Sequence, residues 1–325
     1  MADNNSLIGG GVSSLPFTDR VIIVQILVII FLFINFLLIM TFFQKECFYT
    51  STRYILFAIT LFSDSLILFV TNILLILTYL EFTLQVWVCM ILSASMILFN
   101  IVTPVTLTAM TLERYVAICM PLRHAELCST CSTMHCILII HGLSSVPCIV
   151  ILSTAFATAS LSFYTEPMLC SVETFMLYRW QDYVRSAIQE FYFMIMVIII
   201  IFAYVKIMKV AKAAIIFAYV KIMKVAKAAS GEDKKSSWKG LRTVILHGFQ
   251  LLLCLIQLWT PFIEAAAFQI DFMLFIDFRY SNYVLFSLTP RCLSPLIYGL
   301  RDETFFHALK TFAFFGSYKI NIQKT

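Results

Sequence analysis

Four ionisable residues stand inside long apolar stretches of the sequence: Asp64, Glu190, Glu264 and Arg291. A charge at the centre of a membrane helix costs on the order of 2.5 to 3.5 kcal/mol, so such residues usually face one another or a polar cavity. Their possible chemistry is ion pairing, binding of a charged ligand, or hydrogen bonding between helices. We expect Asp64 to act in a conformational switch. Two partners remain open for Glu264, a small cationic or hydrogen-bonding ligand or Arg291.

The nucleophiles and metal-ligating residues do not favour an enzyme. The five histidines are scattered, and the sequence has no Gly-x-Ser-x-Gly turn and no paired catalytic carboxylates. Cys128 and Cys131 form a Cys-x-x-Cys pair, but no second pair follows with the spacing of a zinc site. We therefore expect no catalytic residue, no metal and no cofactor.

The elements that position these residues are expected to be membrane helices. The 325 residues are 61% hydrophobic and 13% charged, whereas soluble domains have about 25% charged residues. The apolar residues gather in runs of about 18 or more, each long enough to cross the hydrocarbon core. The net charge of +5 comes from segments beside these runs. This placement favours membrane lipid over nucleic acid as a partner.

We predict an all-α membrane protein with a seven-transmembrane helix bundle from residue 21 to residue 300. The spans are expected at about 21–43, 54–79, 89–116, 134–157, 184–208, 239–268 and 281–300. Residues 1–20 would form an N-terminal tail. Residues 301–325 would contain a short amphipathic cytosolic helix, because apolar residues such as Phe305 and Leu309 recur at helical spacing.

The distribution of Lys and Arg predicts the orientation of this bundle. Most of them flank the spans on the side of the C-terminus, which places that end in the cytosol and the N-terminus outside the cell. Asn4 begins an Asn-x-Ser sequence and becomes a candidate glycosylation site. Cys89 at the outer end of the third span and Cys170 in the next outer loop would both face an oxidising compartment. We predict a disulfide between them.

Glu113, Arg114 and Tyr115 stand at the inner end of the third predicted span and are followed by VAICMPLRH. The combined sequence resembles the signature of rhodopsin-like G protein-coupled receptors, in the extended form typical of odorant receptors. LHGFQLLLCL and PRCLSPLIYGLRDETF are similar to segments of a group of fish odorant receptors. The separation of Cys89 and Arg114 corresponds to about 37 Å of helix, enough to cross the membrane.

Two further motifs occur in the order expected from this family. Ser294, Pro295 and Tyr298 resemble the Asn-Pro-x-x-Tyr motif of the seventh span, with Ser in place of Asn. Trp259 and Pro261 resemble the Trp-x-Pro motif of the sixth span. The resemblance implies that these residues belong to an activation switch.

A polar pair completes the switch that the resemblance implies. Asn35 in the first span and Asp64 in the second match the polar pair of this family. Ser294 replaces an Asn that would help Asp64 to hold an ion, and this departure argues against a sodium site.

The resemblance implies a receptor activated by a small-molecule odorant in the outer half of the bundle. Counting helical turns gives the candidate ligand-binding residues Met96, Asn100, Phe262, Glu264 and Ala266. The Glu-Arg-Tyr sequence would contact a heterotrimeric G protein, of the stimulatory or olfactory type by resemblance. A small-solute transporter or channel is the alternative, because it too would contain kinked helices and buried charge.

One segment of the sequence occurs twice. Residues 200–214 read IIFAYVKIMKVAKAA, and residues 215–229 repeat them letter for letter. A helical second copy would lengthen the fifth span by about 22 Å. We expect the first copy to be the membrane one, because moving the second into the membrane would bury Lys206, Lys209 and Lys212.

Overall fold

The computed structural model describes residues 17–170, 178–224, 248–250, 252–257, 259–260, 262–264, 266–267, 269–294 and 305–311. Among these residues, five helices are long and apolar enough to cross a membrane. They are α1 (Phe17–Phe42), α2 (Thr52–Tyr79), α3 (Val86–Cys119), α5 (Thr130–Thr158) and α6 (Arg179–Lys224). The helix η1 (Glu46–Phe48) joins α1 to α2, and α4 (Pro121–Leu127) lies between α3 and α5.

The last two predicted spans are also helical where they are described. Helical residues occur within 248–270, and a continuous run follows through α8 (Phe272–Asn282), the π-helix η4 (Tyr283–Leu288) and α9 (Thr289–Ser294). This run begins before the predicted start at residue 281, because Asp271 caps it by accepting a hydrogen bond from the backbone N–H of Leu274 at 3.3 Å. Asp277 lies within this run, and its carboxylate pairs with Arg20 of α1 at 2.5 Å.

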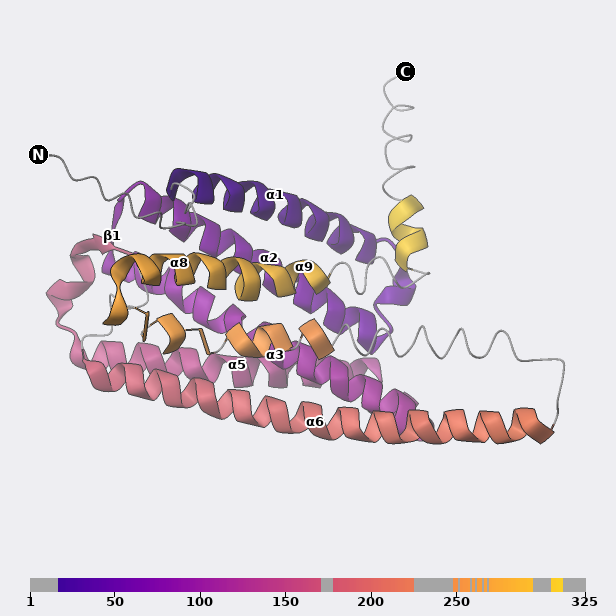
Figure 1. Ribbon diagram of the computed structural model, residues 1–325. Coiled ribbons are helices and arrows are strands. Elements are labelled where there is room, and N and C mark those ends of the chain that lie inside the picture. The colour runs from indigo at the N-terminus through magenta and orange to yellow at the C-terminus, as the bar shows by residue number, and fades with distance from the viewer. Residues whose placement is uncertain are drawn as a thin grey trace, which may run out of the picture.

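Helix α3 occupies the centre of the bundle, where it packs against α2, α5 and α6. Its buried residues include Val102, Leu107 and Met110, which share one core with Leu61 of α2 and Ile140 of α5. Figure 1 shows the long helices lying side by side, with α8 and α9 near α2. This packing closes the inner faces and leaves the outer faces apolar and exposed, as in Phe33 and Phe62. Such faces suit contact with lipid.

Helix α6 is much longer than the predicted fifth span, which ended at residue 208. Its 46 residues correspond to about 69 Å, while a bilayer with its head groups measures about 40 to 45 Å. The helix runs through the first copy of the repeat and continues to Lys224 in the second. Its end projects beyond the neighbouring helices in Figure 1. The first copy therefore continues directly from the apolar part of the helix.

The end of the bundle where α3 begins carries a small structure that the sequence did not predict. Strands β1 (Thr83–Gln85) and β2 (Pro167–Leu169) form an antiparallel two-stranded sheet, preceded by the short helix η2 (Leu161–Thr165). Cys170 follows β2 and forms a disulfide with Cys89 of α3, with Cα atoms 5.4 Å apart. The predicted disulfide is confirmed. It fastens this loop to the N-terminal end of α3.

The amphipathic helix expected after the last span is present at residues 305–311. Phe305 and Ala308 are buried, while Phe306 and Lys310 are exposed. The ring of Phe305 lies 5.1 Å from that of Phe48 in η1 and 5.7 Å from that of Phe57 in α2, centroid to centroid. The helix is therefore held by aromatic contacts with η1 and with the N-terminal part of α2.

Candidate functional site

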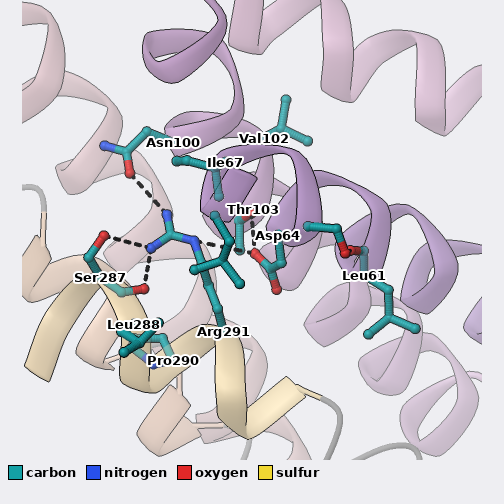
Figure 2. A network of polar contacts seen from close by, with 12 residues as sticks. Leu61, Asp64, Ile67, Asn100, Val102, Thr103, Ser287, Leu288, Pro290 and Arg291 are labelled. Atoms are coloured by element: carbon teal, nitrogen blue, oxygen red, sulfur yellow. Dashed lines mark hydrogen bonds and ion pairs between the residues drawn. The ribbon is translucent and has the colours of Figure 1, made fainter. Parts of the chain in front are cut away.

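Asp64 of α2 and Arg291 of α9 form an ion pair in the interior of the bundle. Nε of Arg291 lies 3.6 Å from Oδ1 of Asp64, and the side chains are 3% and 0% exposed respectively. The hydroxyl of Thr103 in α3 donates to the same Asp64 oxygen at 2.9 Å. Figure 2 shows the two charged side chains pointing toward each other from facing helices. Either charge alone would be costly at this depth, so each accounts for the presence of the other.

The remaining nitrogens of the Arg291 guanidinium bind oxygens of two further residues. Nη1 donates to the backbone carbonyl of Ser287 and, at 2.9 Å, to its hydroxyl. Nη2 donates to Oδ1 of Asn100 in α3 at 3.3 Å (Figure 2). The planar fork of the guanidinium explains how one side chain reaches three residues at once. Its orientation is therefore fixed from α2, α3 and η4 together.

Gln257 extends this network to the helix that carries Trp259. Its Nε2 donates to Oδ1 of Asn100 at 2.8 Å and to the hydroxyl of Ser287 at 3.2 Å. Asn100 Oδ1 thus accepts from both Gln257 and Arg291. The polar network links segments from four parts of the chain, so a shift of any one of them must alter these bonds.

A local feature of the sequence explains the geometry around Arg291. Pro290 has no backbone N–H to continue the helical hydrogen bonding, and the six residues before Thr289 form the π-helix η4. The hydroxyl of Thr289 donates to the carbonyl of Val284 at 2.8 Å. Single π-turns are rare and often occur at functional sites. The carbonyl of Pro290 accepts from Gln250 at 3.2 Å, which ties this irregular turn to the neighbouring helix.

Trp259 lies in an aromatic group two residues beyond Gln257. Its ring centroid is 5.8 Å from that of Phe193 in α6 and 6.3 Å from that of Phe262. These separations are typical of favourable aromatic pairs. A displacement of Phe193 or Phe262 would therefore move Trp259, and with it Gln257 two positions earlier in the same helix.

The candidate ligand-binding residues differ in whether they belong to the polar network. Asn100 belongs to the polar network, and Met96 lies half-buried one turn further out on α3. Glu264 is half-buried and accepts a hydrogen bond from Nδ2 of Asn282 in α8 at 3.2 Å. Phe262 and Ala266 are exposed. The structure therefore brings Asn100, but not Glu264, into direct contact with the ion pair.

The partner of Arg291 was the main question that the sequence left open. The described contacts of Arg291 go to Asp64, Ser287 and Asn100 rather than to Glu264. Sequence reasoning missed Gln257 and Ser287, and their only signal was a polar side chain within an apolar run. The depth of such a residue can be predicted from sequence, but not which neighbour it meets.

The Glu-Arg-Tyr sequence lies near the C-terminal end of α3. Oε1 of Glu113 is 3.4 Å from Nε2 of His124 in α4, and the ring of Tyr115 is 5.7 Å from that of Phe202 in α6. Arg114 is half-buried. Burial and the nearby charge of Glu113 raise the pKa of the Cys128 thiol. That thiol is therefore a weaker nucleophile at neutral pH, because the thiolate is the reactive form.

The remaining predicted residues are those of the activation switch and the glycosylation site. Asn35 is fully buried, and within the described part of the chain its amide makes no hydrogen bond. Ser294 ends α9. Asn4, Pro261, Pro295 and Tyr298 lie outside the described residues. Their assigned roles stay predictions.

Comparison with known proteins gives two findings. The family model described as 7 transmembrane receptor (rhodopsin family) matches residues 34–298. The chain is also similar to a curated protein from Danio rerio named odorant receptor 131-2. The two are 43% identical over 315 residues, which cover 97% of this chain and 92% of the relative. Residues 34–298 span the positions of the ion pair, the polar network and the aromatic group of this chain.

Proposed function

The chain belongs to the rhodopsin family of seven-transmembrane receptors, and from this we propose that it is a cell-membrane receptor activated by a small-molecule odorant. The observation that carries the proposal is the similarity, along nearly the whole chain, to a receptor whose name states an odorant. An odorant would change the receptor only by binding one packing of the bundle better than another. The network of polar contacts between helices is the part of this chain whose bonds such a change would alter.

We place the odorant in the outer half of the bundle, among Met96, Asn100, Phe262, Glu264 and Ala266. The contact of Trp259 with Phe193 and Phe262 supports this location, since Phe262 is one of these residues and Trp259 follows Gln257 of the polar network by two positions. Glu264 would select odorants with a cationic or hydrogen-bond-donating group. Its bond with Asn282 holds the carboxylate in a defined position for such a contact.

The inner end of the bundle would bind a heterotrimeric G protein of the stimulatory or olfactory type. In the resting state Glu113 would neutralise Arg114, and release of Arg114 would free its guanidinium for the partner. The contact between Glu113 and His124 offers the carboxylate a second partner on α4. Movement of α4 would therefore alter the charge balance around Arg114.

This assignment places the N-terminus outside the cell and the C-terminus in the cytosol. The disulfide at the end of the bundle near β1 supports the orientation, because disulfides persist on the oxidising side of the membrane. Asn4 would then be available for glycosylation. Asn35, Asp64, Trp259 and the residues from Ser294 to Tyr298 would rearrange on activation.

The experiment is an odorant screen of cells that express the full chain together with a stimulatory G protein. We expect at least one odorant to raise cyclic AMP, and Arg114→Ala to abolish that rise at unchanged surface level. Arg123→Ala, at an exposed position of α4, is the matched control. Odorant-dependent solute flux without cyclic AMP would instead support a transporter or channel.

A second variant tests the proposed ligand class. Glu264→Gln retains a carbonyl that can accept from Asn282 but removes the negative charge. A hydrogen bond to a charged group contributes roughly 1.5 to 3 kcal/mol, so potency for amine odorants should fall about 10- to 100-fold. Uncharged odorants should be affected much less. Identical dose-response curves across the panel would contradict the role of Glu264.

A further inference from the structure

The oxygens around Arg291 form a site for a single positive charge. Oδ1 of Asp64, Oδ1 of Asn100, and the carbonyl and hydroxyl oxygens of Ser287 all converge on its guanidinium (Figure 2). Carboxylate, carbonyl and hydroxyl oxygens are also the ligands that hard cations prefer. The donor set would therefore suit a small cation if the guanidinium were absent.

The guanidinium is fixed in this site by its burial and its bonds. Its side chain is 3% exposed, so water cannot easily replace the protein oxygens around it. Leaving the site would expose the charge of Asp64, itself fully buried, without its described cationic partner. The ion pair is consequently a permanent part of this packing of the helices.

A sodium ion does not fit the site while Arg291 occupies it. Two positive charges about 4 Å apart repel each other, and at an effective dielectric constant of about 20 this lowers cation affinity by roughly 10³-fold. The same oxygens would also have to release the guanidinium. Both effects act in the same direction and disfavour bound sodium.

We propose that Arg291 is a built-in cation for Asp64, which makes the stability of this receptor independent of sodium. The side chain occupies the place that a diffusible ion would need, and it additionally connects α2 to α3 and η4. Replacing it by a small polar residue should convert the same oxygens into a sodium site. The site lies in the interior of the bundle and requires neither an odorant nor a G protein.

The experiment measures the thermal unfolding midpoint of the purified full-length protein in detergent. Sodium chloride is compared with choline chloride at equal ionic strength, so that general salt effects cancel. For the wild type we expect equal midpoints at all concentrations. For Arg291→Ser we expect a saturable rise in sodium of roughly 3 °C, the size expected from a site filled to about ten times its Kd.

Two further variants separate the effect of the positive charge of Arg291 from the effect of the space that its side chain occupies. Arg291→Lys keeps a positive charge and should remain insensitive to sodium. Asp64→Asn/Arg291→Ser removes both charges and should also remain insensitive, since the site has lost its anion. The midpoints then depend on sodium only where Asp64 is present without a neighbouring cation.

The wild-type measurement can overturn the proposal even if Arg291→Ser does not fold. A saturable, sodium-specific rise of the wild-type midpoint would overturn the proposal, because the ion would then bind beside Arg291. A folded Arg291→Ser protein with the same midpoint in both salts would overturn it as well. Equal wild-type midpoints together with a sodium response in Arg291→Ser would support it.

Discussion

Nε2 of Gln257 donates a hydrogen bond to Oδ1 of Asn100 at 2.8 Å, and this bond ties the helix that carries Trp259 to α3. Asn100 also accepts from Arg291, so Gln257 and the buried ion pair share one acceptor atom on α3. A substitution of Asn100 would therefore alter the hydrogen bonds of both Gln257 and Arg291. This relationship links the proposed odorant site to the interior of the receptor.

Gln257→Leu should raise the basal activity of the receptor. The substitution removes two hydrogen bonds, each worth about 1 kcal/mol, that favour the observed packing. Their loss corresponds to a shift of about 5- to 30-fold between packings. Basal cyclic AMP, normalised to surface expression, is the measurement. Gln269→Leu, at an exposed position, is the control. Unchanged basal activity in Gln257→Leu would show that these bonds do not restrain activation.

Loss of the disulfide should impair folding. The two cysteines are separated by 81 residues, and closing a loop of that length stabilises the folded state by about 4.5 kcal/mol in the chain-entropy treatment. Cys89→Ser, Cys170→Ser and the double variant should lose surface expression to the same extent, since each lacks the same bond. Cys47→Ser, at an exposed free cysteine, should behave as wild type. Additive losses would argue against a shared bond.

The reactivity of Cys128 should depend on Glu113 and on pH. The raised pKa of Cys128 means that less thiolate is present at neutral pH, so alkylation should accelerate as pH increases. Glu113→Gln removes the negative charge that contributes to this effect. The rate at Cys128 should therefore increase, and mass spectrometry of iodoacetamide-treated membranes can measure it. Exposed Cys131 provides the internal comparison; an unchanged ratio of the two rates would contradict the electrostatic contribution.

Phe305→Ala should destabilise the protein far more than Phe306→Ala. Phe305 is fully buried against Phe48 and Phe57, whereas Phe306 is 42% exposed. Removing a buried Phe side chain costs about 3 to 5 kcal/mol. Thermal unfolding in detergent should show a clearly lower midpoint for Phe305→Ala alone. Equal effects of the two substitutions would mean that the contact with η1 contributes little.

Deleting residues 215–229 should leave membrane insertion intact. Helix α6 already exceeds the length required to cross a bilayer, and the first copy of the repeat retains its own lysines. Surface expression and odorant response should be preserved or improved. Deletion of 193–207, which removes the same number of residues from within the predicted span, should prevent surface expression. Failure of the first deletion to reach the surface would show that the second copy is required.

Much of this architecture is determined by local properties of the chain. Long apolar runs dictate helices of membrane length, because a backbone in lipid must satisfy its own hydrogen bonds. The amphipathic spacing around Phe305 likewise predicts the helix at 305–311. The positions of Cys89 and Cys170 on one side of the membrane were sufficient to predict their disulfide. Each of these inferences needs only the order of residues along one segment.

Which polar groups meet inside the bundle was decided by the tertiary structure. The sequence placed Asp64, Glu264 and Arg291 at membrane depth, but the rotation of each helix about its axis determines which neighbour a side chain faces. The π-helix before Pro290 changes that rotation, and Arg291 consequently meets Asp64 and Asn100 while Glu264 meets Asn282. The sequence by itself therefore determined the spans and the depth of their charges. Only the packing of the helices decided the partners, because partner choice depends on contacts between segments far apart in the chain.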